Sequence, residues 1–101
     1  MAPSLRAKGI KMALLDFEGV QAQECEARRG KPDAFYILGL AYSTGQGVET
    51  NLVEAHKWFN LAAMKGVAEA REKRAEISAE LGAAGVAEAQ RSARAWLSSL
   101  H

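Results

Sequence analysis

The sequence predicts an all-α fold, a short α-solenoid of antiparallel helix pairs. Apolar residues recur with the period of a helix in two consecutive segments, and a glycine-rich stretch at residues 45–50 separates them. A pattern of alanine, glycine and acidic residues also recurs after 36 residues (66 − 30 = 36), within the range of helical repeats. No segment shows the alternation of apolar and polar residues that is typical of a strand.

The first helix of the central pair follows Pro32 and Asp33. Proline suits the first turn because its missing N–H is not needed there, and an early Asp complements the helix dipole. We expect one face to be buried, and it carries Ala34, Ile37, Leu38, Ala41 and Tyr42. Glycine inside a helix costs about 1 kcal/mol relative to alanine. Gly39 therefore predicts a neighbouring helix that passes too close to this position for a Cβ.

A tight reversal and a second helix come next. Gly45 and Gly47 permit the positive φ that such a reversal needs. Asn51 is a favourable N-cap, and Glu54 follows three residues later, as in a capping box. Apolar residues then occupy most of the circumference of the helix, which indicates packing between neighbours. They include Leu52, Ala55, Trp58, Phe59, Ala62 and Ala63, and Lys65 and Gly66 end the helix.

Weaker copies of the pattern flank this pair. Ala27-x-x-Gly30-x-x-Asp33-Ala34 recurs as Ala63-x-x-Gly66-x-x-Glu69-Ala70. One repeat therefore ends near Gly30 and another begins near Val67, and both are degenerate, as the end repeats of a solenoid are expected to be. We predict a flexible basic N-terminus at residues 1–10 and a single helical repeat domain at residues 11–101, with the full repeat at about 31–66.

The central residues resemble the Sel-1-like repeat, a relative of the tetratricopeptide repeat with a longer loop between its helices. The motif residues that carry the resemblance are Ala34, Leu38, Gly39, Tyr42, Gly45, Gly47, Ala55, Trp58, Phe59, Ala62 and Gly66. They contain the tetratricopeptide elements Leu-Gly-x-x-Tyr and Ala-x-x-x-Phe. The resemblance implies a tetratricopeptide-like right-handed superhelix used for protein–protein contact, without catalytic residues. The C-terminal end is also similar to those of small bacterial proteins of this family.

The flanking segments are predicted to be helical as well. A helix is expected over residues 11–29, with Gly19 as a position where it could break in two. A charged helix follows at residues 68–81, and Gly82 and Gly85 bracket a break. Beyond it, apolar residues including Trp96 align on one side up to the C-terminus. We expect this amphipathic segment to pack as the terminal solenoid helix, and the alternative is a helix on a membrane surface.

Charge and hydropathy argue against several functions. The net charge of +1 gives no electrostatic reason to expect nucleic acid or an anionic membrane as a partner. The basic residues before position 12 precede an apolar run that is too short for a signal peptide. No run approaches the roughly 20 residues of a membrane span. Cys25 is the single cysteine, which suits a reducing compartment, and we expect a cytoplasmic protein.

No catalytic or metal site is predicted, and no cofactor. An enzyme would need a nucleophile–base pair or convergent carboxylates on facing elements. His56 is accompanied by no second histidine or spaced carboxylate that would make a metal site, and Cys25 has no evident histidine partner. The loop at residues 45–50 lacks the lysine of a phosphate-binding loop, so we interpret it as a structural turn.

The favoured function is that of an interaction module for an unknown protein or peptide. The candidate binding residues lie opposite the buried face of the first helix, on what the resemblance implies is the concave surface: Tyr36, Leu40 and Ser43, with Asp33 at the rim. One alternative is that these are scattered surface residues, because single exposed apolar side chains are normal. Another is a self-assembling unit, a homodimer through an open end of the solenoid.

Overall fold

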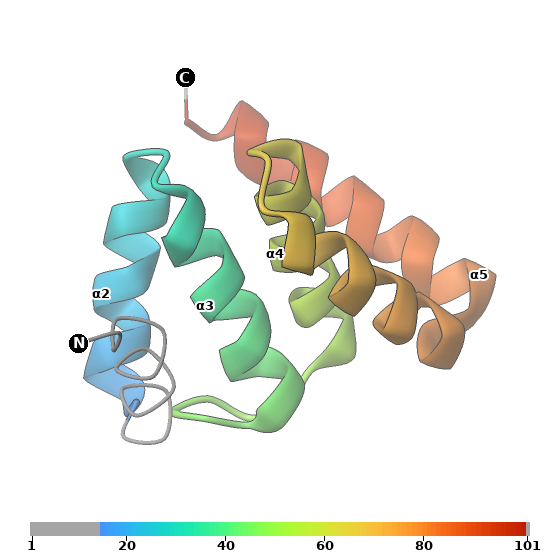
Figure 1. Cartoon of the computed structure of the whole chain (residues 1–101), viewed down its shortest axis with the longest axis horizontal. Helices are drawn as coiled ribbons and strands as arrows, with labels where there is room; N and C mark the ends of the chain where they lie inside the picture. Colours follow the sequence, from blue (N-terminus) through green and yellow to red (C-terminus); the bar gives the residue numbers. More distant parts are fainter. Residues whose placement is uncertain (1–14, 101) are drawn as a thin grey trace.

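The computed structural model describes residues 15–100, and this part of the chain forms four helices (Figure 1). They are α2 (Phe17–Arg28), α3 (Pro32–Thr44), α4 (Leu52–Met64) and α5 (Ala68–Ser98). No strand occurs within residues 15–100, and the predicted all-α fold is confirmed. The predicted basic segment 1–10, and residues 11–14 of the first predicted helix, lie outside the described residues. Gly19 lies inside α2 and does not break it.

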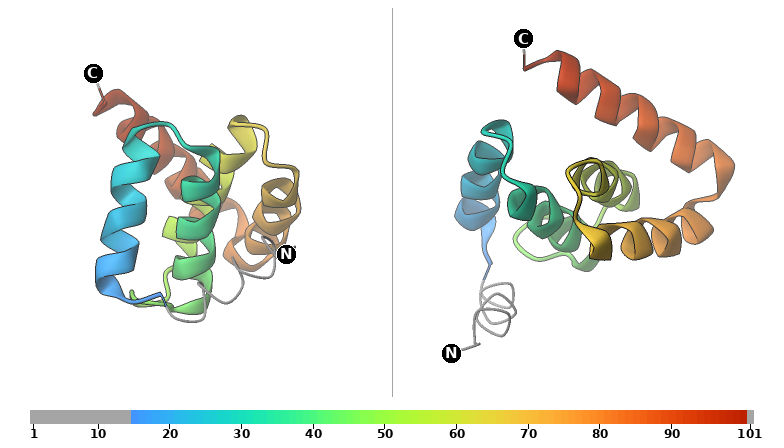
Figure 2. Two further views of the ribbon diagram at one scale, coloured as in Figure 1. Left: turned by 60° about the vertical axis from the view of Figure 1, so that its left-hand side comes forward. Right: turned by 45° about the horizontal axis from the view of Figure 1, so that its top comes forward.

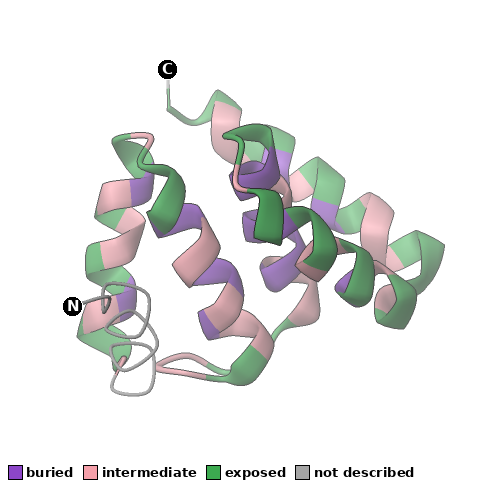
Figure 3. Cartoon of the chain, in the orientation of Figure 1, coloured by how far each residue is buried: buried purple, intermediate pink, exposed green. Residues whose placement is uncertain are grey.

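The antiparallel pair of α3 and α4 forms the centre of the molecule. Most of the residues buried in these helices face each other or the flanking helices, whereas much of α5 is exposed (Figure 3). The predicted face of α3 is buried at Ala34, Leu38 and Ala41, and Ile37 and Tyr42 are half-buried. Phe35 is also fully buried, which the helical period did not indicate, because α3 has neighbours on more than one side.

A close approach of α4 explains the glycine inside α3. A Cβ placed on Gly39 would lie 2.5 Å from two carbon atoms of the Phe59 ring. Atoms at that separation overlap, so only glycine fits without movement of the ring. The predicted helix crossing at Gly39 is confirmed, and its partner is Phe59.

The loop between α3 and α4 turns through two glycines in left-handed backbone regions. Gly45 has φ 78° and Gly47 has φ 76°, as the sequence predicted. The backbone amide of Gly45 donates to the carbonyl of Ala41 at 2.8 Å, which ends α3. A Cβ on Gly47 would lie 2.6 Å from the backbone of Asp16. The loop therefore packs against the residue that caps α2.

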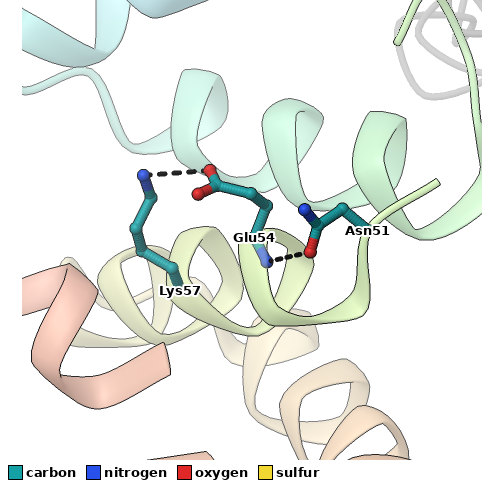
Figure 4. Close-up of polar contacts among 3 residues, drawn as sticks. All are labelled: Asn51, Glu54 and Lys57. Carbon is teal, nitrogen blue, oxygen red and sulfur yellow. Dashed lines mark hydrogen bonds and ion pairs between the residues drawn. The ribbon is translucent and has the colours of Figure 1, made fainter. Parts of the chain in front are cut away.

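The start of α4 is capped by Asn51, as predicted (Figure 4). Its side-chain oxygen accepts a hydrogen bond from the backbone amide of Glu54 at 3.1 Å. The reciprocal half of a capping box is not formed. The Glu54 carboxylate instead lies 3.0 Å from the Lys57 ammonium group. The backbone N–H of Asn51 donates to the carbonyl of Tyr42 at 2.9 Å.

The turns before and after the central pair have equivalent geometry. Gly30 has φ 81° and Gly66 has φ 92°. The amide of Gly30 donates to Ala27 at 2.8 Å, and the amide of Gly66 donates to Ala63 at 3.0 Å. Since these glycines are 36 residues apart (66 − 30 = 36), the sequence repeat corresponds to a repeat of structure. The helix α2 is thus the second helix of a preceding repeat, and α5 begins the next.

The long α5 consists of two helical parts that meet at Gly82. Gly82 has φ 76° and ψ 175°, which interrupts the helix and turns its direction. Figure 2 (right) shows α4 nearly end-on between the first part, residues 68–81, and the second part, residues 83–98. The predicted break is confirmed at Gly82, and Gly85 continues the second part. In this last repeat a single glycine replaces the loop that joins α3 to α4.

Three aromatic rings join the second part of α5 to the central pair. The Trp96 ring lies 5.5 Å from that of Phe35 and 5.2 Å from that of Trp58, both in edge-to-face arrangements. Phe35 and Trp58 are in turn 6.0 Å apart. Such pairs contribute about 0.5–1.5 kcal/mol beyond their buried area. Trp96 therefore packs on the core, and the predicted docking of the terminal helix is confirmed.

Candidate protein-binding surface

Of the predicted binding residues on α3, Tyr36 is the one that packs on α4 and is influenced by charges of α5. Tyr36 is half-buried, and its ring packs 5.7 Å from that of Phe59. Burial, followed by the charges of Glu69, Glu72 and Glu76, raises the pKa of the Tyr36 hydroxyl above its usual value. These three acids belong to α5. Tyr36 therefore packs on α4, is influenced by the acidic side chains of the first part of α5, and keeps part of its surface open to solvent.

Leu40 and Ser43 continue this side of α3 toward its C-terminal end. Both are half-buried, and Leu40 packs against the core together with Tyr36. The Ser43 hydroxyl donates to the Leu40 carbonyl at 3.1 Å. Tyr36 and Leu40 were predicted to lie opposite the buried face, yet both contact the core. The helical period of α3 alone could not show this, because Phe59 of α4 packs on Tyr36.

Asp33 is the fourth predicted residue. It lies in the first turn of α3, and it is exposed. A carboxylate there complements the positive end of the helix dipole. We call the surface formed by these α3 residues and by residues 68–81 the α3–α5 face, and its side chains are Asp33, Tyr36, Leu40, Ser43, Glu69, Glu72 and Glu76.

A second polar cluster lies between α4 and α5. His56 is buried, and its Nε2 lies 2.9 Å from the hydroxyl oxygen of Ser78. One turn away, the Arg74 guanidinium donates to the Asn60 side-chain oxygen at 2.8 Å. Burial first, and then the Arg74 charge, lowers the pKa of His56. In the sequence His56 has no second histidine, cysteine or spaced carboxylate beside it, and its partner Ser78 is 22 residues away in the chain.

Within the described residues, the surroundings of His56 differ from those of a histidine that activates a serine nucleophile. A serine nucleophile needs a histidine that a third group orients, and donors that stabilise the developing oxyanion. The Nδ1 of His56 has no hydrogen-bond partner within the described residues. The His56 side chain is also only 1% exposed, so a substrate could not reach it without movement of α5.

A buried lysine lies next to His56 on α4. Lys57 places its ammonium group 3.0 Å from a Glu54 oxygen and 4.4 Å from the centre of the Trp58 ring (Figure 4). A paired carboxylate and a ring face each stabilise a desolvated cation. This pair contributes to the packing around Trp58 and presents no free charge for a ligand.

The structure also places the single cysteine and the acidic side chains of the described helices. Cys25 is exposed on α2. Within residues 15–100, no three histidine, cysteine or acidic side chains are grouped so that they could hold a metal ion. None of the helices described is both long enough and apolar enough to cross a membrane.

Antiparallel helix pairs that recur every 36 residues place the chain among tetratricopeptide-like helical repeat proteins. Residues 32–67 match the model of the Sel1 repeat family, so this segment of the chain is a Sel1-like repeat. This match contains α3, the glycine loop and α4. No curated protein and no solved structure gave a significant match. Sel1 repeats are in general non-catalytic modules of protein–protein interaction.

Proposed function

We propose that this protein binds a peptide or protein partner on the α3–α5 face. The observation that carries the proposal is the position of Tyr36, a half-buried aromatic ring that packs on Phe59 of α4 within the influence of the acidic side chains of α5. Its packing on Phe59 fixes the ring before a partner arrives, so little conformational entropy is lost on binding. Tyrosine is also enriched among the residues that dominate the energy of protein interfaces.

The neighbours of Tyr36 give this face a mixed character. Leu40 adds an aliphatic group one turn along α3, and Ser43 adds a hydroxyl after it. Glu69, Glu72 and Glu76 border Tyr36 from the first part of α5. An apolar centre with a polar rim is the usual organisation of a protein interface.

The experiment is affinity capture from the native host followed by mass spectrometry. We compare the wild type with Tyr36→Ala/Leu40→Ser and with Glu72→Lys, which changes an exposed side chain of the same face. Recovery of the main partner is expected to fall at least about tenfold in both, which corresponds to about 1.4 kcal/mol. Glu88→Lys, an exposed site on the second part of α5, is the matched control.

Thermal melting of each variant separates loss of binding from loss of fold. Tyr36 and Leu40 contact the core, so the double variant is expected to melt lower than the wild type, whereas Glu72→Lys is not. If Glu72→Lys and the double variant remain folded and still capture the partner, the proposed face is wrong. If the captured protein is this chain itself, the alternative of a self-assembling homodimer is the correct one.

A further inference from the structure

We propose that His56 is an acid-sensitive latch, whose neutral imidazole holds residues 68–81 of α5 against α4 and whose protonation releases them. The contact crosses between the two helices. His56 lies on α4 and Ser78 on the first part of α5, and the imidazole Nε2 is 2.9 Å from the serine hydroxyl oxygen. His56 is 1% exposed, so the ring is enclosed by protein.

The second ring nitrogen is what makes the contact depend on pH. The Nδ1 of His56 is buried and has no hydrogen-bond partner among residues 15–100. A neutral imidazole has one N–H group, which Nε2 can donate to Ser78 while Nδ1 stays unprotonated. In the protonated ring both nitrogens are donors, and Nδ1–H would be a charged, buried donor without an acceptor. Such a group carries the full cost of its lost hydration.

The charged groups around His56 add to this cost. Arg74 faces it from α5 and is held in place by its hydrogen bond to Asn60, so a second positive charge would be repelled there. On α4 itself, the Lys57 ammonium group is directed to Glu54 and to the Trp58 ring. No carboxylate among the described residues forms an ion pair with His56 to offset its charge.

Several acidic side chains near α3 influence the two tyrosines of that helix. Glu69, Glu72 and Glu76 act on the hydroxyl of Tyr36. Burial, followed by the charges of Glu24 of α2 and Glu54 of α4, raises the pKa of Tyr42 on α3.

The direction of the pH dependence follows from linkage. Folding lowers the pKa of His56, so the unfolded or released state binds a proton more readily than the packed state. The stabilising contribution is fully present above the unfolded pKa of about 6.5 and is lost as the pH falls below that value. Residues 68–81 form half of the α3–α5 face. If the proposed function holds, acid would therefore also weaken partner binding, but the latch itself does not depend on that function.

The first test is direct titration of the imidazole by NMR. The Cε1–H resonance of His56 is followed from about pH 8 to pH 4.5 in the whole chain, with His101→Gln to remove the signal of the second histidine. The midpoint is expected below the value of about 6.5 of an ordinary histidine. Arg74→Gln keeps a donor for Asn60 and removes the charge, so it is expected to raise that midpoint. A midpoint at or above the ordinary value overturns the proposal.

The second test locates the effect in the structure. Amide hydrogen exchange is measured at about pH 7.5 and pH 5.0 and corrected for the intrinsic pH dependence of exchange. Protection of residues 68–81 is expected to fall several-fold at the lower pH, whereas α2 and α3 retain theirs. A uniform loss of protection, or none, overturns the proposal.

A variant separates the role of His56 from other acid effects. His56→Gln preserves a side-chain amide that can reach Ser78 and cannot take up a proton. In His56→Gln, the amides of residues 68–81 are expected to be equally protected from hydrogen exchange at both pH values. The His101→Gln control is expected to behave as the wild type. If His56→Gln loses protection with acid as the wild type does, another group is responsible. If this variant does not fold, the NMR titration and the exchange of the unaltered chain decide the question.

Discussion

Gly39 and Phe59 lie in direct contact across the central helix pair. A Cβ on Gly39 would come within 2.5 Å of Cδ1 and Cε1 of the Phe59 ring. Phe59 is itself fully buried, so its ring has little room to move. The distance between α3 and α4 is therefore set by a glycine on one helix and a phenyl ring on the other.

This contact predicts that larger side chains at position 39 destabilise the protein. Gly39→Ala is expected to cost about 1–3 kcal/mol and Gly39→Leu more, because a packed core accommodates added atoms poorly. At an exposed helical site, Gly→Ala would instead stabilise by about 0.5–1 kcal/mol. Urea unfolding of both variants measures the effect. In a Phe59→Leu background the cost of Gly39→Ala should shrink, and stabilisation by both variants at position 39 would refute the contact.

The break in α5 predicts an unusual requirement for glycine at position 82. Its φ of 76° with ψ of 175° is accessible essentially only to glycine. No atom lies within 4 Å of a Cβ placed there, so the cost of Gly82→Ala is a backbone cost, about 1–3 kcal/mol. Gly82→Asn should cost as much, because asparagine tolerates the left-handed helical region but not this one. Unfolding free energies equal to that of the wild type would show that the chain does not turn here.

The aromatic cluster predicts that Trp96 fixes the second part of α5. Trp96→Ala removes the contacts with Phe35 and Trp58 and is expected to cost about 2–4 kcal/mol, less than a fully buried tryptophan because Trp96 is only half-buried. Trp96→Phe should recover part of this loss. Leu100→Ala, at an exposed site of the same C-terminal segment, is the control. Equal stability of Trp96→Ala and Leu100→Ala in urea would contradict the docking of this helix.

The N-cap at the start of α4 predicts that removing the Asn51 side chain lowers stability and that another capping side chain restores it. Asn51→Ala removes the acceptor for the Glu54 amide and is expected to cost about 1 kcal/mol, whereas Asn51→Asp and Asn51→Ser should be close to the wild type. Thermal unfolding of the three variants provides the comparison. If all three melt alike, the hydrogen bond does not contribute to stability.

Local signals in the sequence were enough to predict the helix pair and its ends. Glycine is favoured where the backbone needs a positive φ, which is a local requirement. In the structure the φ angle is positive at Gly30, Gly45, Gly47 and Gly66. Asn51 and Pro32 likewise act on the residues next to them in the chain. Such local signals are readable without knowledge of distant neighbours, and they sufficed to identify the repeat.

Which faces are buried and which polar groups meet depends on how the helices pack. Phe35 is buried because Trp96, 61 residues later (96 − 35 = 61), returns to cover it. The helical period of α3 placed Tyr36 opposite its buried face, but packing on Phe59 partly buries it. His56 and Ser78 come together only because the first part of α5 lies against α4. These contacts depend on how helices pack, and helix packing joins residues whose separation along the chain carries no periodic signal.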